Sequence, residues 1–165
     1  MKKFIVPMLL ILPLWLSAQE IKIAVVNAQA VMNAMPEVSD MESQLATLQQ
    51  QFQKEAKIME DEYNRKYSDL QAQGDSLTEN IRILRLQEIQ DIATRMENFA
   101  PMAREQITKK QDELLAPIQE KIMKAIKEVG EENGYTYVLN YGVLYHIGPN
   151  GIDATDKVKA KLGIK

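Results

Sequence analysis

Most of this chain follows one pattern, in which single apolar residues recur every three or four positions among polar ones. The pattern covers residues 39–73 and resumes over residues 76–129, where Gln, Glu, Asp and Lys fill the other positions. A spacing of about 3.5 residues is typical of the narrow seam of a coiled coil. It predicts two long helices, the second of them kinked or interrupted at Pro101 and Pro117, because proline removes a backbone donor and crowds the preceding turn. The apolar pattern stays in phase through Pro101, which favours a kink there.

The ends of these helices carry their own signals. Gly74 is the only glycine among the first 129 residues, and glycine suits the left-handed position at which a helix ends. Ser39 with Glu42, and Ser76 with Glu79, have the S-x-x-E spacing of a capping box, which satisfies free backbone N–H groups at a helix start. We therefore expect one helix to end at Gly74 and the next to begin at Ser76.

Short apolar stretches at both ends of the chain predict three strands. Residues 21–27, 135–140 and 143–147 are rich in β-branched and aromatic side chains, and Tyr141-Gly142 can form a tight turn between the last two. A final helix is expected over residues 154–162, with Asp153 as its N-cap and Gly163 at its end.

The two long helices could form one rod or fold back as a hairpin. A rod of about 90 residues would be roughly 135 Å long and would keep the predicted strands apart. In an antiparallel hairpin, facing positions have a constant sum, and Phe52 with Phe99 and Leu70 with Ile81 both sum to 151. The predicted fold class is therefore α+β, mainly α: a long antiparallel coiled-coil hairpin attached to a small β body.

The first residues have the order of a secretory signal peptide. Two lysines precede an apolar run over residues 4–16, and the small residues Ser17 and Ala18 follow. The run is about 20 Å long as a helix, too short for a bilayer core of about 30 Å. We expect residues 1–18 to be a signal peptide cleaved after Ala18, and residues 19–165 to form a single domain.

Composition excludes several classes of function. Without residues 1–18 the chain keeps 18 Lys and Arg against 23 Asp and Glu, a formal charge of −5. This acidic balance argues against binding to nucleic acid or to anionic membrane surfaces. His146 is the only histidine and there is no cysteine, so no catalytic, metal-binding or cofactor-binding set is expected and an enzyme is the least favoured class.

These segments together are similar to a known family. The stretches IKIAVVNAQAVM from residue 21, YTYVLNYGVLYHIG from residue 135 and IDATDKVKAKL from residue 152, with the glutamine-rich hairpin between them, resemble the Skp/OmpH family of periplasmic chaperones. The resemblance implies a homotrimer whose strands form the body and whose helical arms enclose a cavity. It further implies that unfolded outer-membrane proteins are held there after export, without ATP. The best-known members are strongly basic, so the acidic charge here argues against lipopolysaccharide binding.

The resemblance gives roles to two sets of residues. Candidates for contact with unfolded clients are the apolar residues of the arms: Met59, Tyr63, Tyr67, Leu70, Ile81, Ile83, Leu84, Leu86, Ile89, Ile92, Met96 and Phe99. Candidates for the oligomer body are the apolar residues of the strands: Ile23, Val25, Tyr137, Leu139, Val143 and Tyr145. Most of the arm residues are expected to hold the two helices together, whereas Ile83, Leu86 and Ile89 lie off the seam and are the better candidates for a cavity wall.

A different function is compatible with the same architecture. A structural or adaptor coiled coil of the cell envelope would bind one defined folded partner instead of many unfolded chains. A cytosolic hairpin chaperone of the prefoldin type shares the architecture, but the signal peptide contradicts it.

Overall fold

The structure, a computed structural model, describes residues 21–73 and 76–164. The signal peptide predicted over residues 1–18 and the turn glycine Gly74 lie outside the described residues. Element by element, a strand and a short helix lead into two long helices, and two further strands and a final helix complete the chain.

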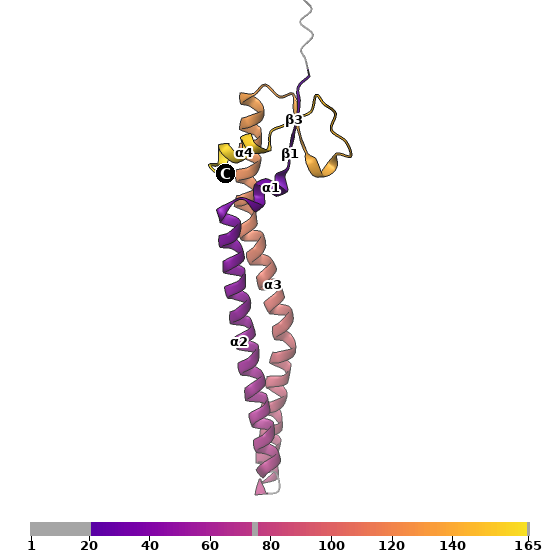
Figure 1. The fold of residues 1–165 in the computed structure, drawn as a ribbon. Helices are drawn as coiled ribbons and strands as arrows, with labels where there is room; N and C mark the ends of the chain where they lie inside the picture. Colours follow the sequence, from indigo (N-terminus) through magenta and orange to yellow (C-terminus); the bar gives the residue numbers. More distant parts are fainter. Residues whose placement is uncertain (1–20, 74–75, 165) are drawn as a thin grey trace, which may run out of the picture.

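Two long helices lie side by side over most of the molecule (Figure 1). They are α2, Pro36–Gln73, and α3, Glu79–Glu132. The rings of Phe52 and Phe99 meet edge to face with 5.9 Å between their centroids, which confirms the hairpin register derived from the seam. We call α2 and the facing part of α3, residues 79–116, the arm.

The start of α2 differs from the prediction. The helix begins at Pro36, so Ser39 lies inside it, and the capping box assigned to Ser39 and Glu42 is wrong. Proline is accepted at the first helical position because the N–H that it lacks would have no intrahelical partner there.

The start of α3 also differs from the prediction. Ser76 does not cap α3; its hydroxyl donates to the carbonyl of Gln73 at 2.8 Å, at the end of α2. The N-cap of α3 is Thr78, whose extended backbone makes the cap without a side-chain hydrogen bond.

The body end of α3 extends further than its apolar pattern suggests. Pro101 and Pro117 lie within the helix, which also continues through Gly130 to Glu132. Gly130 is buried, and a Cβ atom there would lie 3.3 Å from Cγ2 of Val138. The role of this glycine is therefore close packing against a neighbouring strand; the chain turns later, at Gly134, which has φ +63°.

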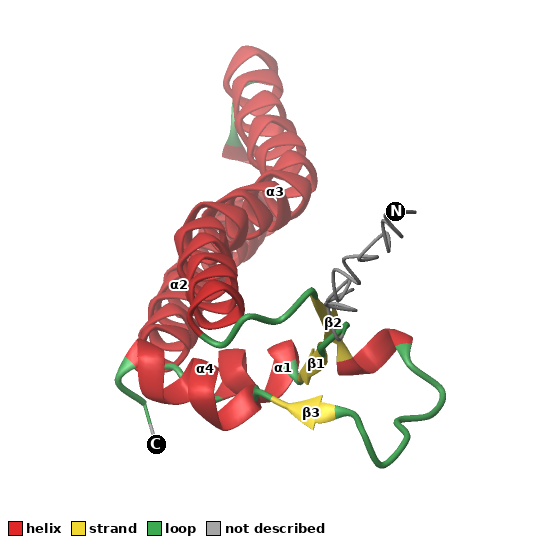
Figure 2. Cartoon of the chain, turned by 90° about the horizontal axis from the view of Figure 1, so that it is seen from above, coloured by secondary structure: helices red, strands yellow, loops and turns green. Residues whose placement is uncertain are grey.

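Three strands from both ends of the chain form one parallel sheet, which confirms that the distant predicted strands meet (Figure 2). The central strand is β1, Ile23–Val26, and its neighbours are β2, Tyr137–Asn140, and β3, Ile152–Asp153. Val25 of β1 is paired with Leu139 on one side and with Asp153 on the other.

The predicted strand over residues 143–147, and the tight hairpin leading to it, are wrong. The chain leaves β2 through a short 3-10 helix, η2, Tyr141–Val143, and a loop then crosses to β3 on the far side of β1. A two-residue turn cannot join parallel strands, since both must run in the same direction. The apolar Leu144 and Ile147 instead line a hollow against the sheet. These side chains are apolar because they cover the sheet, and they do not belong to a paired strand.

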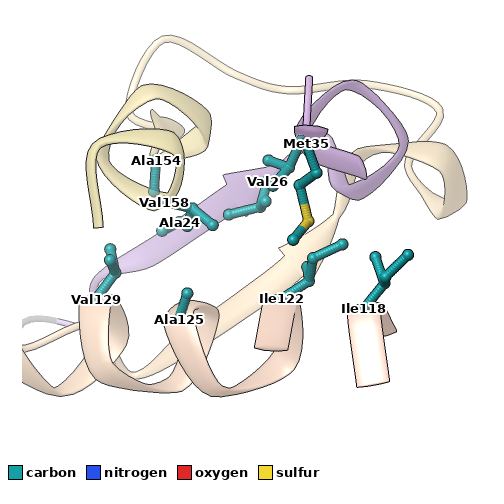
Figure 3. Close-up of a cluster of buried hydrophobic side chains, with 10 residues drawn as sticks. Ala24, Val26, Met35, Ile118, Ile122, Ala125, Val129, Ala154 and Val158 are labelled. Atoms are coloured by element: carbon teal, nitrogen blue, oxygen red, sulfur yellow. The ribbon is translucent and has the colours of Figure 1, made fainter. Parts of the chain in front are cut away.

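The core lies between the sheet and the body end of α3 (Figure 3). Ala24 and Val26 point from β1 toward α3, which contributes Ile118, Ile122, Ala125 and Val129. Met35, Ala154 and Val158 complete the labelled cluster. One face of the sheet is therefore closed by helices.

The two remaining helices are joined to each other beside this core. They are α1, Ala28–Asn33, and α4, Thr155–Leu162. The N–H of Asn27 donates to Oγ1 of Thr155 at 3.0 Å, and Oδ1 of Asn27 accepts from the N–H of Ala30. Because 128 positions separate Asn27 from Thr155, this contact joins the two ends of the described chain.

The start of α4 is close to the prediction. The N-cap is Ala154 and not Asp153, but Oδ1 of Asp153 accepts the N–H of Thr155 at 2.8 Å. Hydrogen bonds from Thr155 hold the pKa of Asp153 below its ordinary value. Gly163, with φ +73°, ends the helix as the sequence indicates.

Candidate functional site

The arm is held together by few buried contacts. No residue of α2 is buried, and on the arm part of α3 only Ile89, Ile92 and Ala103 are. Ion pairs cross between the helices from Lys66 to Glu88 at 2.7 Å and from Arg95 to Glu62 at 3.7 Å. Exposed pairs of this kind contribute about 0 to 1 kcal/mol each. The arm is therefore a thin helix pair in which part of the apolar surface has no cover.

The predicted arm residues fall into three groups. Ile89 and Ile92 are 7% and 2% exposed. The half-buried group is Met59, Tyr63, Leu70, Met96 and Phe99. The exposed group is Tyr67, Ile81, Ile83, Leu84 and Leu86, and we call these five residues the tip patch. Ile89 was wrongly expected to line a cavity wall, because it is buried, while Ile83 and Leu86 do face solvent.

The tip patch lies near the end of the arm that is remote from the body. Its five side chains are between 42% and 57% exposed. Four of them come from the first two turns of α3, and Tyr67 of α2 stacks on Tyr63 with 6.1 Å between ring centroids. Three nearby cations lie close to carboxylates: Arg82 is 3.7 Å from Glu79, and Lys66 and Arg85 are 2.7 Å and 3.1 Å from Glu88. The exposed character of this patch is therefore mainly apolar.

Three exposed apolar residues of the long helices were absent from the predicted set. Ile58, Met102 and Met123 are each exposed. Ile58 is adjacent to the seam residue Met59 and lies off the seam, the criterion that singled out Ile83 and Leu86 on α3. Applied to α2 as well, that criterion would have found Ile58.

The second face of the sheet carries another apolar surface. The strand register places Ile23 opposite Tyr137 and Val25 opposite Leu139, so all four side chains share the face away from α3. We call these four residues the sheet face. Val25 is buried, whereas the other three are exposed.

The loop between β2 and β3 covers only part of this face. A hollow of about 400 Å³ remains between the sheet and loop residues such as Leu144 and Ile147. Val143 and Tyr145 project from the η2 and loop segment and are strongly exposed. An apolar surface of this kind on a small body is typical of an interface.

One ion pair joins the arm to the body. The Lys121 ammonium donates to Glu37 at the start of α2, and this hydrogen bond holds the pKa of Glu37 below its usual value of 4.5. Beside the pair, Met41, Leu114 and Pro117 line a hollow of about 320 Å³ between the two long helices. The contact attaches the start of α2 to α3 at the base of the arm.

Side chains that could bind a metal ion are dispersed over the described residues. Over residues 21–73 and 76–164, His, Asp and Glu side chains nowhere form a group of three that could hold a metal ion. His146 is exposed at the rim of the sheet-face hollow. Within the same ranges, the helices include none that is both long and apolar enough to span a bilayer.

Comparison with known proteins agrees with this architecture. The family model described as outer membrane protein (OmpH-like) matches residues 22–162. A crystal structure from Caulobacter crescentus CB15, described as a candidate outer membrane chaperone (OmpH-like), superposes with a TM-score of 0.77 at 14% sequence identity. The superposition covers 86% of this chain and 83% of that one, and at this identity it shows the shared fold. No curated protein sequence matches. The family match extends over both surfaces and both long helices, and the chain therefore belongs to the OmpH-like family of outer membrane proteins.

Proposed function

We propose that this protein is a periplasmic holdase, which binds unfolded outer-membrane proteins after export and prevents their aggregation without ATP. The observation that carries the proposal is the arm: a slender helix pair with an uncovered apolar tip patch, attached at one end to a small body. Membership of the OmpH-like family, which is not an enzyme family, and the likeness to a candidate outer membrane chaperone support the same role.

The chemistry of the expected clients fits these surfaces. Strands of an outer-membrane barrel alternate apolar and polar side chains, and their unpaired edges aggregate in water. A half-exposed Leu or Ile gains about 1 kcal/mol when a client covers it. The five side chains of the tip patch, four of them Leu or Ile and one Tyr, give about 5 kcal/mol per arm, and ordering the client offsets part of this gain. One arm then binds a segment with roughly millimolar affinity, which is weak enough for release.

We further propose that the chain works as a homotrimer. The sheet face and the exposed Val143 and Tyr145 supply an apolar surface on the body, and a body of this size gains stability by burying it against other copies. Three arms would then surround one space, and several weak contacts to the same client would add up to a longer residence.

Aggregation of a denatured barrel protein tests the holdase role. A urea-unfolded outer-membrane protein is diluted into buffer with the mature chain, residues 19–165, and light scattering is followed without nucleotide. Suppression at near-stoichiometric amounts is expected. Absence of suppression at several-fold excess contradicts the proposal, and capture of a single folded envelope protein would favour an adaptor. Mass measurement of the mature chain in solution tests the trimer separately, since a monomer at micromolar concentration contradicts a shared cavity.

A further inference from the structure

The exposed apolar side chains of the arm are concentrated near its tip. Within the described part of α3, four exposed apolar residues fall between Ile81 and Leu86, and the next is Met102. The intervening stretch contains Ile89 and Ile92, which are both buried. Exposed apolar side chains therefore lie close together near the end of the arm, whereas elsewhere on the arm they are isolated, as at Ile58 and Met102.

These residues do not share one face of the helix. At about 100° per residue, Ile81 and Leu84 lie about 60° apart, and so do Ile83 and Leu86. The centres of the two pairs are separated by about 160°, so they occupy opposite flanks of α3. The first flank continues the seam toward α2, and the second faces away from it.

The size of the patch limits what can occupy it. Five side chains about half exposed offer on the order of 400 Å² of apolar surface, whereas a stable folded interface takes about 800 Å² from each partner. A rigid partner docked on one flank would also leave the other flank uncovered. The patch is therefore too small and too divided for a stable complex with a folded protein.

The charges around the patch argue against a lipid surface. Arg82 and Arg85 are paired with Glu79 and Glu88, and Lys66 also binds Glu88. Hydrogen bonds from Lys66 and Arg85 hold the pKa of Glu88 below its usual value, so Glu88 is ionised at neutral pH, and the two carboxylates already occupy these cations. Anionic headgroups would have to compete with them. A flexible, apolar polypeptide segment has neither difficulty, because it can wrap both flanks and needs no counter-charge.

We infer that the arm tip is a two-sided grip for unfolded polypeptide: one client segment contacts both flanks of α3 near its start, and capture takes place at the mouth of the cavity as well as inside it. This inference rests on the proposed holdase function and adds the position and the shape of the capture site.

Paired substitutions in the mature protein separate the two flanks. The variants are I81Q/L84Q for the seam flank and I83Q/L86Q for the outer flank, because glutamine keeps helix propensity and removes the apolar surface. M102Q/M123Q is the matched control: its two residues are 40% and 64% exposed, against 52% and 48% for Ile83 and Leu86. Circular dichroism and solution mass should match the wild type for all three variants, since every changed side chain is exposed.

The expected result is a loss confined to the tip. In the aggregation assay, each tip variant should need about thirtyfold more protein for half suppression, because each loses two apolar contacts of about 1 kcal/mol. The control should stay within about twofold of the wild type. A photoreactive phenylalanine derivative placed at position 83, or in a second protein at position 84, should crosslink the unfolded client in both cases.

Other results would overturn the inference in distinguishable ways. Equal loss in tip and control variants means that clients bind along the whole of α3, which would support the holdase function and contradict capture at the tip. Loss on one flank only contradicts two-sided capture. A changed solution mass in the tip variants identifies a second copy as the occupant, and binding to anionic vesicles that disappears with I83Q/L86Q, with client suppression intact, identifies a membrane. If the wild type suppresses no aggregation, the proposed function fails and the grip fails with it.

Discussion

The contact between α3 and β2 at Gly130 gives a quantitative test of the body. An ideal Cβ at this position lies 3.3 Å from Cγ2 of Val138, slightly closer than the optimum of about 3.5 to 4.0 Å for two carbon atoms. Gly130→Ala gains about 1 kcal/mol of helix propensity, and mild crowding offsets this gain. The free energy of unfolding of the alanine variant should therefore lie within about 1 kcal/mol of the wild-type value.

Gly130→Val should behave differently, because it adds two further methyl groups against β2. Overpacking of a core usually costs about 1 to 3 kcal/mol, and valine gains less helix propensity than alanine, so we expect a net loss of about 2 kcal/mol. Val138→Ala removes the opposing methyl groups. The double variant Gly130→Val with Val138→Ala should lose at least about 1 kcal/mol less free energy of unfolding than the sum of the losses in the two single variants.

Urea unfolding followed by far-UV circular dichroism measures these differences. All variants are compared at one protein concentration, because the stability of an oligomer depends on concentration. A Gly130→Val variant within about 0.5 kcal/mol of the wild type would refute the close approach of β2 to α3. So would a double variant whose loss equals the sum of the two single losses.

Three further outcomes test the base of the arm, the loop and the assembly surface. Because Lys121 lowers the folded-state pKa of Glu37, this ion pair should stabilise the fold above pH about 4.5, and the stabilisation should be lost as the pH falls through the folded-state pKa. The difference in free energy of unfolding between the wild type and Glu37→Gln should therefore vanish in acid. A difference that stays constant from neutral to acidic pH would contradict this. Gly151→Ala should lower stability by about 1 to 2 kcal/mol in urea unfolding, because its Cβ would lie 2.2 Å from Cγ2 of Ile147, and unchanged stability would mean that the loop rearranges freely. Leu139→Asp should weaken assembly at least about tenfold by placing a charge on the apolar sheet face, and analytical ultracentrifugation showing an unchanged mass would exclude that face from the interface.

The arm follows from the sequence because its determinants are local. A seam with a period near 3.5 specifies a helix and the stripe that the helix buries, and facing apolar residues of similar spacing select one register. The contact between Phe52 and Phe99 is the direct consequence. The local pattern does not determine which residues of the seam are exposed. Ile81 and Leu84 continue the seam but are exposed, while Ile89 lies off the seam and is buried. Which flank α2 covers depends on how the two helices twist around each other.

The body, by contrast, was decided by tertiary contacts. The sequence indicates strands at both ends of the chain, but the edge of β1 that each strand reaches, and its direction there, depend on the path of the chain between the strands. Here β2 and β3 lie on opposite edges and parallel to β1, so residues 141–151 become a crossover that covers part of the sheet face, and the expected hairpin does not form. Gly130 shows the same limit at one residue, since a mid-helix glycine reads as a helix end until β2 is seen packed against it. Periodicity acts between neighbours along the chain and determined the arm; the sheet is paired across more than a hundred residues, and only the folded structure shows its direction and its uncovered face.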